Sequence, residues 1–188
     1  MMRYFSYFLI FLCYSVGAIE TYNIDPEHSF SNWKIRHVVS MTSGTVSDMS
    51  GIITIDRDDI NKSEINIKIN LLGINSNHKK RDSHIKEKNF LDTDNFSKIT
   101  FVSNEIKSND NNTGTIKGLL NLHGISKEIS MPFKVLGYGS DPWGGYRVGI
   151  QANTTIKVSD FGYTWGEKPN ASLGNEVVLE FLIEGIRQ

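Results

Sequence analysis

Apolar and polar residues alternate along most of the chain after residue 20. Residues 65–71, 129–135, 148–158 and 177–183 each carry an apolar residue at nearly every second position. Successive side chains of a strand point to opposite faces, so this pattern predicts half-buried strands with one polar face. Many such strands, separated by short turn-forming stretches, predict an all-β protein built on an antiparallel sheet.

The sheet can close into a barrel or split into a sandwich, and periodicity alone does not separate the two. Closure would remove the exposed strand edges that invite aggregation. The predicted strands Ile125–Tyr138 and Tyr146–Val158 are 13 to 14 residues long. That is roughly 45 Å at about 3.3 Å per residue, against about 17–20 Å for a usual strand. Strands of this length favour a tall barrel with a long inner surface.

The first 18 residues differ from the rest of the chain. Arg3 precedes an apolar run, and Val16 and Ala18 then have the spacing of a small-residue cleavage site. This layout is typical of a secretory signal peptide. The alternative is a membrane anchor, but Tyr4–Ile19 is shorter than the ~20 residues that span a bilayer. We therefore predict a cleaved signal peptide at residues 1–18 and a single exported domain at residues 19–188.

Residues 75–92, NSNHKKRDSHIKEKNFLD, interrupt the alternation. They fit a helical period, so we predict a short helical insertion near residues 77–91 that covers one end of the sheet and is capped by Ser76 or Asn77. Acidic residues interleave with its bases, and the whole chain has a formal net charge of −1. A solvated helix face explains the bases better than a nucleic-acid interface does.

Common catalytic and metal-binding signatures are missing from the sequence. There is no Gly-x-Ser-x-Gly elbow and no phosphate-binding glycine loop. His78 and His84 are six positions apart, which does not place both on one helix face. We therefore predict no catalytic residue and no metal site.

Five regions of the sequence, one of which holds three neighbouring motifs, resemble in order and spacing the motifs of one known family. Arg81–Ile85, Asn89–Asp92 and Ile99–Phe101 are similar to the Arg-Asp-x-His-Leu, Asp-Phe-Phe-Asp and Thr-Phe elements of the YceI-like, polyisoprenoid-binding family. The other matching segments are Tyr22–Ser29, Gly118–Lys127, Ser159–Gly162 and Gly174–Val177. Two positions depart from the family pattern. Asn95-Phe96-Ser97 replaces a Tyr-Pro before the Thr-Phe strand, and Val158 replaces an Arg before Ser-Asp-Phe-Gly, which puts a head-group contact from that Arg in doubt.

The resemblance implies an eight-stranded, antiparallel, lipocalin-like barrel in the bacterial periplasm. It also implies a long isoprenoid or similar lipid, such as a polyprenyl or quinone-like species, in an interior tunnel. No further cofactor and no enzymatic activity are implied. Expected partners are the lipid and, transiently, a membrane, but no nucleic acid. The oligomeric state is open, and a homodimer is one alternative.

An eight-stranded barrel is wide enough either to be filled by its own side chains or to hold one ligand. Inward apolar residues are therefore core residues or tunnel residues, and the long strands and the resemblance favour a tunnel. On that basis, substituting Trp for Ile67 or Ile150 should block the tunnel and leave the fold largely intact. The predicted tunnel residues are Trp33, Ile35, Ile67, Ile69, Phe101, Phe133, Val135, Ile150, Leu179 and Phe181.

Arg81, Asp82 and His84 have two interpretations. In the first, Arg81 and Asp82 form a bidentate pair and His84 donates to a carbonyl, which ties the helix to the barrel rim. In the second, Arg81 and His84 face a lipid head group. The structural interpretation is favoured.

Two other functions stay open from the sequence. The protein could be a structural β-domain without a ligand. It could also be an enzyme acting on a bound amphiphile, with His28, His84 or His123 as a base.

Overall fold

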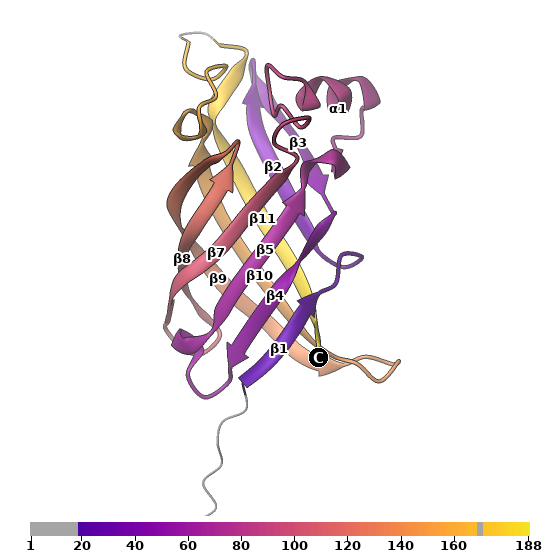
Figure 1. Cartoon of the computed structure of the whole chain (residues 1–188), viewed down its shortest axis with the longest axis vertical. Helices are drawn as coiled ribbons and strands as arrows, with labels where there is room; N and C mark the ends of the chain where they lie inside the picture. The colour runs from indigo at the N-terminus through magenta and orange to yellow at the C-terminus, as the bar shows by residue number, and fades with distance from the viewer. Residues whose placement is uncertain (1–18, 169–170) are drawn as a thin grey trace, which may run out of the picture.

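The structure of the chain, a computed structural model, describes residues 19–168 and 171–188. The predicted signal peptide lies outside these residues. The fold is almost entirely strand, with one short helix at one end (Figure 1). In chain order the elements are β1 (Ile19–Ile24), β2 (Phe30–His37), β3 (Ser40–Val46), β4 (Met49–Asp56), η1 (Ile60–Lys62), β5 (Glu64–Asn70), η2 (Leu71–Gly73), β6 (Ile74–Asn75), α1 (Lys79–Lys86), β7 (Lys98–Ser108), β8 (Thr113–Leu122), β9 (Ile125–Ser140), β10 (Tyr146–Lys157), η3 (Val158–Phe161) and β11 (Leu173–Arg187).

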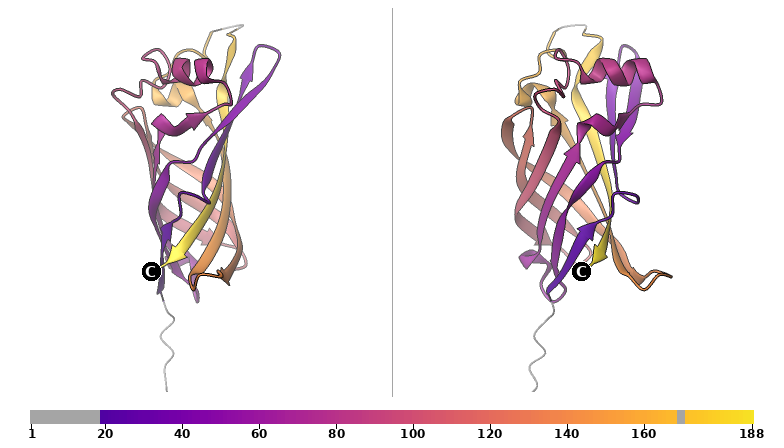
Figure 2. Two further views of the ribbon diagram at one scale, coloured as in Figure 1. Left: turned by 90° about the vertical axis from the view of Figure 1, so that its right-hand side faces the viewer. Right: turned by 45° about the vertical axis from the view of Figure 1, so that its right-hand side comes forward.

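The strands form one closed antiparallel sheet. Neighbours in the chain are neighbours in the wall, and β1 pairs with β11 to complete the ring. Three wall strands are composite: β1 continues into β2, β3 into β4, and β5 into β6, while β7 to β11 are continuous. The predicted closed eight-stranded antiparallel barrel is confirmed, as is a helical segment at one end, which we call the upper end (Figures 1 and 2).

The alternation in the sequence corresponds to the two faces of the wall. On β5, Ile65, Ile67 and Ile69 are buried, whereas Glu64 and Lys68 are exposed. The inward residues of β8, β9 and β10 alternate in the same way, and together they form one hydrophobic core along the barrel axis. The segments of alternating apolar and polar residues therefore form a single-layer barrel wall with an apolar inner face.

The wall strand made of β1 and β2 is broken at residues 25–29, where side chains replace the ladder. The Ser29 hydroxyl receives the Glu184 amide at 3.0 Å and lies 3.3 Å from the Glu184 carbonyl. Just outside, Arg147 Nη1 donates to Asp25 at 2.7 Å and also to Glu184, and its Nε donates to Asp141 at 2.7 Å. This cluster joins β1, β10 and β11 across the break.

Two details of the prediction are wrong. The strand β3 was not expected, because SMTSGTV carries no apolar alternation. The helix α1 is shorter than the predicted segment, and its N-cap is His78, whose Nδ1 accepts from the Arg81 amide at 3.2 Å, and not Ser76 or Asn77. Within the ranges 19–168 and 171–188, no helix has both the length and the apolar character needed to span a membrane.

The lower end of the barrel is closely packed. Tyr22 and Val148 have no exposed surface there. Gly185 permits this packing, since a Cβ at that position would lie 2.9 Å from the Tyr22 Cβ.

Asp25 is expected to make stability depend on pH in acid. Burial by itself would raise the pKa of its carboxyl, but hydrogen bonds from Arg147, His28 and the Glu27 amide hold that pKa at about 2. A carboxyl with a depressed folded-state pKa stabilises the fold above its unfolded pKa, and this contribution is lost as the pH falls. Between pH ~4 and ~2 we expect a loss of roughly 1–2 kcal/mol from this group.

Urea denaturation of the wild type and Asp25→Asn from pH 7 to pH 2 tests this expectation. The variant should be less stable at neutral pH and should show a shallower decline between pH 4 and 2. Asp58→Asn, in an exposed turn, is the matched control. An equally steep decline in Asp25→Asn would contradict the assignment.

Candidate ligand-binding cavity

Within the part of the chain that the structure describes, the main hollows of the barrel interior are unequal in size. The upper cavity, bounded by α1, has a volume of about 310 Å³. The middle hollow has about 50 Å³ and the lower hollow about 20 Å³. Residues shared between the upper cavity and the middle hollow are Ser31, Ile69, Ile99, Leu122, Ile156 and Leu179. Ile65, Ile116 and Ile150 line both the middle and the lower hollow. The interior is thus one apolar column, wide above and almost filled below.

Trp33 and Ile35 bring β2 into the wall of the upper cavity. Trp33 pairs across the ladder with Gly44 of β3, and a Cβ at Gly44 would lie 2.5 Å from the Trp33 ring. Because Gly44 has no side chain, the Trp33 indole can pack directly over it. Val177 and Leu179 of β11 pair with Ile35 and Trp33 and continue the apolar wall.

Aromatic side chains form another part of the wall. The rings of Phe90 and Trp165 have centroids 6.2 Å apart, those of Trp165 and Tyr163 are 5.5 Å apart, and Tyr163 stacks on His123 at 4.6 Å. Phe90, Tyr163 and Trp165 all line the upper cavity. The chain turns toward them after η3 at Gly162, which has a φ of 81°. A left-handed φ of this kind favours glycine.

The mouth of the upper cavity is polar. Exposed His37, His84 and Ser172 belong to its lining, together with half-buried Thr42 and Arg81. These residues come from the β2–β3 hairpin, from α1 and from the segment before β11. The cavity is therefore suited to an amphiphilic molecule, with its apolar tail in the interior and its polar group among these side chains.

Arg81 and Asp82 do not form the predicted bidentate pair. Both bind Ser76 instead: Arg81 Nε donates to the Ser76 hydroxyl at 2.7 Å and Nη2 to its carbonyl at 2.6 Å. The Asp82 carboxylate accepts from the Ser76 amide at 2.8 Å and from its hydroxyl. Burial would raise the pKa of Asp82, but these bonds with Ser76 and the charge of Arg81 lower it. The two charges thus clasp one buried serine and fix α1 to β6.

His84 does not donate to a backbone carbonyl as expected. Its Nδ1 lies 3.0 Å from the Glu87 carboxylate, and its ring contacts Phe90 edge-on with centroids 4.5 Å apart. Lys86 makes the tie to the barrel that was assigned to His84, because its Nζ donates to the Leu72 carbonyl at 2.6 Å.

Three hydrogen-bond donors in the wall of the upper cavity are buried without a partner among residues 19–168 and 171–188. They are Trp33 Nε1, Trp165 Nε1 and the Tyr163 hydroxyl. Burial, and after it the charge of Asp92, raise the pKa of the Tyr163 phenol, which therefore stays protonated. An unpartnered buried donor costs about 1–3 kcal/mol, so three in one wall require an explanation.

All ten predicted tunnel residues line one of the three hollows. Trp33 and Ile35 line the upper cavity, and Ile69 and Leu179 line both it and the middle hollow. Those lining the middle hollow are Ile67, Phe101, Phe181 and Ile150, the last of which also lines the lower one. Phe133 and Val135 line only the lower hollow. Whether these residues contact a lipid remains a prediction.

Several cavity residues escaped sequence reasoning. Phe90, Tyr163 and Trp165 lie in stretches without alternation, so no strand pattern marked them. Val158 is buried in the cavity wall at the position where the family pattern has an Arg. The clustering of aromatic residues in Phe161-Gly162-Tyr163-Thr164-Trp165 was the one signal that could have indicated this wall.

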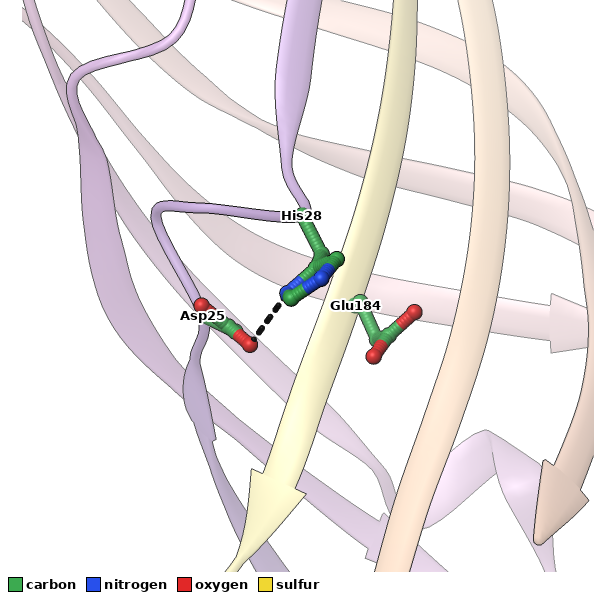
Figure 3. A group of neighbouring side chains, drawn as sticks. All are labelled: Asp25, His28 and Glu184. Carbon is green, nitrogen blue, oxygen red and sulfur yellow. Dashed lines mark hydrogen bonds and ion pairs between the residues drawn. The ribbon is translucent and has the colours of Figure 1, made fainter. Parts of the chain in front are cut away.

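Asp25, His28 and Glu184 form the arrangement closest to a metal site in the described part of the chain (Figure 3). One ligand atom from each lies within 4.8 Å of the others. His28 Nδ1 is 2.8 Å from Asp25, and both carboxylates already receive Arg147. A cation would have to compete with that guanidinium, so the geometry is that of an ion-pair network.

The three histidines considered as bases lie apart. His28 belongs to the loop after β1, His84 to α1, and His123 to the β8–β9 turn, with its Nδ1 3.2 Å from the Phe161 carbonyl. Of these, only His84 lines the upper cavity.

The sequence is similar to a described protein family and to its relatives. A family model described as the YceI-like domain matches residues 22–185. A UPF0312 protein of Yersinia enterocolitica is 37% identical over 182 residues, which cover 95% of this chain and 92% of that protein.

Two solved structures share the fold. BcnA of Burkholderia cenocepacia superposes with a TM-score of 0.76 at 20% identity, over 86% of this chain and 98% of that one. A polyisoprenoid binding domain from Saccharophagus degradans superposes with a TM-score of 0.65 at 16% identity, over 89% and 98% of the two chains. At these identities the likeness establishes the barrel architecture.

The unequal hollows change the expected effect of Trp substitutions. Ile150→Trp places a large ring where about 50 Å³ is free, so overpacking should cost roughly 1–3 kcal/mol or more. Val177→Trp faces the upper cavity of about 310 Å³ and should lose less than 1 kcal/mol. Urea denaturation of both variants measures the difference. Equal losses would mean that the upper cavity is not open space.

Arg81→Ala should lower the free energy of unfolding by about 1.5–3 kcal/mol, because a charged donor is removed and Ser76 loses two partners. Lys80→Ala, at a neighbouring exposed position on α1, is the control and should change stability by less than 0.5 kcal/mol. Full stability in Arg81→Ala would show that the clasp does not hold the helix.

Proposed function

The chain belongs to the family of YceI-like domains, and on that premise we propose that it binds a long-chain isoprenoid or similar lipid. The observation that carries the proposal is the upper cavity, which is apolar within and polar at its mouth. Its volume of about 310 Å³ lies at the lower end of the range for small-molecule sites. The polyisoprenoid binding domain with the same fold supports an isoprenoid as the first ligand to test.

The size of the cavity limits how much of a chain it holds as it stands. Small-molecule sites have volumes of roughly 300–1,000 Å³, so a cavity of about 310 Å³ accommodates only part of a long isoprenoid chain. A longer chain must widen the middle and lower hollows or leave part of itself outside. Branched aliphatic residues dominate the walls shared by these hollows, and small rotamer changes there would enlarge the column.

The polar group of the lipid has two sets of candidate partners. Arg81, His84 and His37 surround the mouth. Trp33, Trp165 and Tyr163 carry the unpartnered donors of the wall, which an acceptor such as a quinone carbonyl or an alcohol oxygen would satisfy. The three donors favour a ligand with acceptor oxygens.

The energetics favour a carrier that exchanges its lipid. Each methylene removed from water contributes about 0.8 kcal/mol, but a lipid in a bilayer is already out of water. Transfer from bilayer to barrel is then nearly neutral in the apolar term, so shape and head-group contacts decide occupancy. We propose reversible transport, storage or sequestration. We further propose that residues 1–18 are a cleaved signal peptide and that the 19–188 domain acts in the periplasm.

The decisive experiment is extraction of the purified protein with organic solvent, followed by mass spectrometry of the extract and of the intact chain. A stoichiometric lipid, with an N-terminus at Ile19, supports the proposal. A chemically altered lipid after incubation supports an enzyme. An empty extract from protein that also fails to bind added lipid supports a structural barrel.

A series of prenyl alcohols tests the size limit. Geraniol, farnesol and geranylgeraniol should bind with affinities that rise roughly tenfold or more per isoprene unit until the cavity is full, because each added unit is removed from water. Tryptophan fluorescence titration gives the dissociation constants, since Trp33 and Trp165 line the cavity.

Matched valines provide the control for this series. Val177→Trp should weaken binding of the longest alcohol at least tenfold, because its side chain faces the upper cavity. Val178→Trp, on the outer face with 42% of its surface exposed, should leave binding unchanged. Identical affinities for the two variants would mean that the ligand binds outside the barrel.

A further inference from the structure

The turn at the tip of the β2–β3 hairpin has exposed apolar residues where a solvent-exposed turn usually has glycine and polar residues. His37 pairs with Ser40, so the turn consists of Val38 and Val39 alone. Val38 has a φ of 51°, a conformation that is strained for a β-branched residue and that glycine normally occupies in such turns. Val39 is 95% exposed and Val38 53%. A strained backbone at Val38 and two exposed apolar side chains thus coincide at this tip.

Both backbone groups of Val38 are paired within the protein. The Val38 amide donates to the Ser172 carbonyl at 2.6 Å, and the Val38 carbonyl accepts from Arg36 at 2.9 Å. Arg36 also donates to the Ala171 and Leu173 carbonyls, which braces the hairpin against the start of β11. Because its amide and carbonyl are already paired, Val38 can leave water without exposing an unsatisfied backbone group.

The hairpin lies beside the mouth of the upper cavity and at the same end as α1 (Figure 2). His37, which flanks the turn, and Thr42 line the cavity, and Met41 near the tip is 46% exposed. Residues 79–88 carry five bases and two acids, a net +3, in a chain whose formal charge is −1. The apolar tip and the basic helix therefore flank one opening.

We propose that this end of the barrel docks on an anionic lipid bilayer, with Val38, Val39 and Met41 entering the headgroup region and Lys79 and Lys80 contacting lipid phosphates. Basic residues near an anionic surface add to the apolar contribution. The docked orientation places the cavity mouth against the membrane. The inference goes beyond the proposed function and does not depend on a lipid being held inside.

Vesicle sedimentation tests the docking surface. The protein is expressed from the full sequence, and its N-terminus is determined by mass spectrometry so that a retained leader is recognised. Wild type should bind vesicles of phosphatidylcholine and phosphatidylglycerol at 3:1 and bind pure phosphatidylcholine more weakly. Lys79→Glu/Lys80→Glu should remove that difference.

The central variant is Val38→Gly/Val39→Ser, which supplies a favourable two-residue turn. Its melting temperature should equal or exceed that of wild type, because glycine relieves the strain at Val38. Its partitioning to the 3:1 vesicles should fall roughly tenfold or more through loss of the valine side chains. Trp143→Ser, which removes an 82% exposed apolar residue from the β9–β10 turn at the opposite end, should partition like wild type.

Three results would overturn the inference. The first is that the wild-type protein does not bind the vesicles, and the second is that the tip variant binds them as well as the wild type does. The third is that the wild type is a dimer which the tip substitution dissociates, because the tip would then be a contact between two copies of the chain. Solvent extraction of the same samples separates this inference from the proposed function. If the tip variant retains lipid but no longer binds vesicles, the docking inference and the proposed lipid binding are both supported. If the protein binds vesicles but neither retains nor binds lipid in its interior, only the docking inference is supported.

Discussion

Closure of the sheet between β1 and β11 is the constraint on which the other features depend. Once the ring is complete, every second side chain must lie inside, and their combined volume decides whether the interior is solid or hollow. In the lower half, Phe133, Tyr22 and Val148 fill the space. In the upper half the wall is completed by β2, β3 and β6 and by the segments that carry α1 and Trp165, and these leave the larger cavity open.

The upper end is held by polar contacts because it has less apolar packing to rely on. The helix α1 has no buried residue, and Ser76 and the Leu72 carbonyl secure it through Arg81, Asp82 and Lys86. A rim held in this way keeps charged groups at the mouth without burying them in the column. Arg81 and Asp82 thus hold the helix through Ser76 and not through the predicted pair with each other, while Arg81 also belongs to the cavity lining.

Most of the barrel wall could be predicted from the sequence, because polar and apolar residues must alternate along a strand that has one solvent-exposed face and one buried face. Residues 65–70 and 148–157 follow this rule and are strands. The rule does not reach β3, where small and polar residues lie against Trp33, or the segment from Tyr163 to Trp165, where side chains reach the cavity from irregular backbone. The Arg81 and Asp82 partners could not be predicted either, because both depend on where the fold brings Ser76.

The taper of the interior sets the order of events for any chain that it holds. Tyr22 and Val148 are fully buried at the lower end, whereas the exposed residues that line the upper cavity lie beside α1 and the β2–β3 hairpin. A lipid bound as proposed would enter tail-first and leave head-first, past the same few side chains. On the proposed function, the membranes that supply and receive the lipid would therefore contact the same end of the protein one after the other.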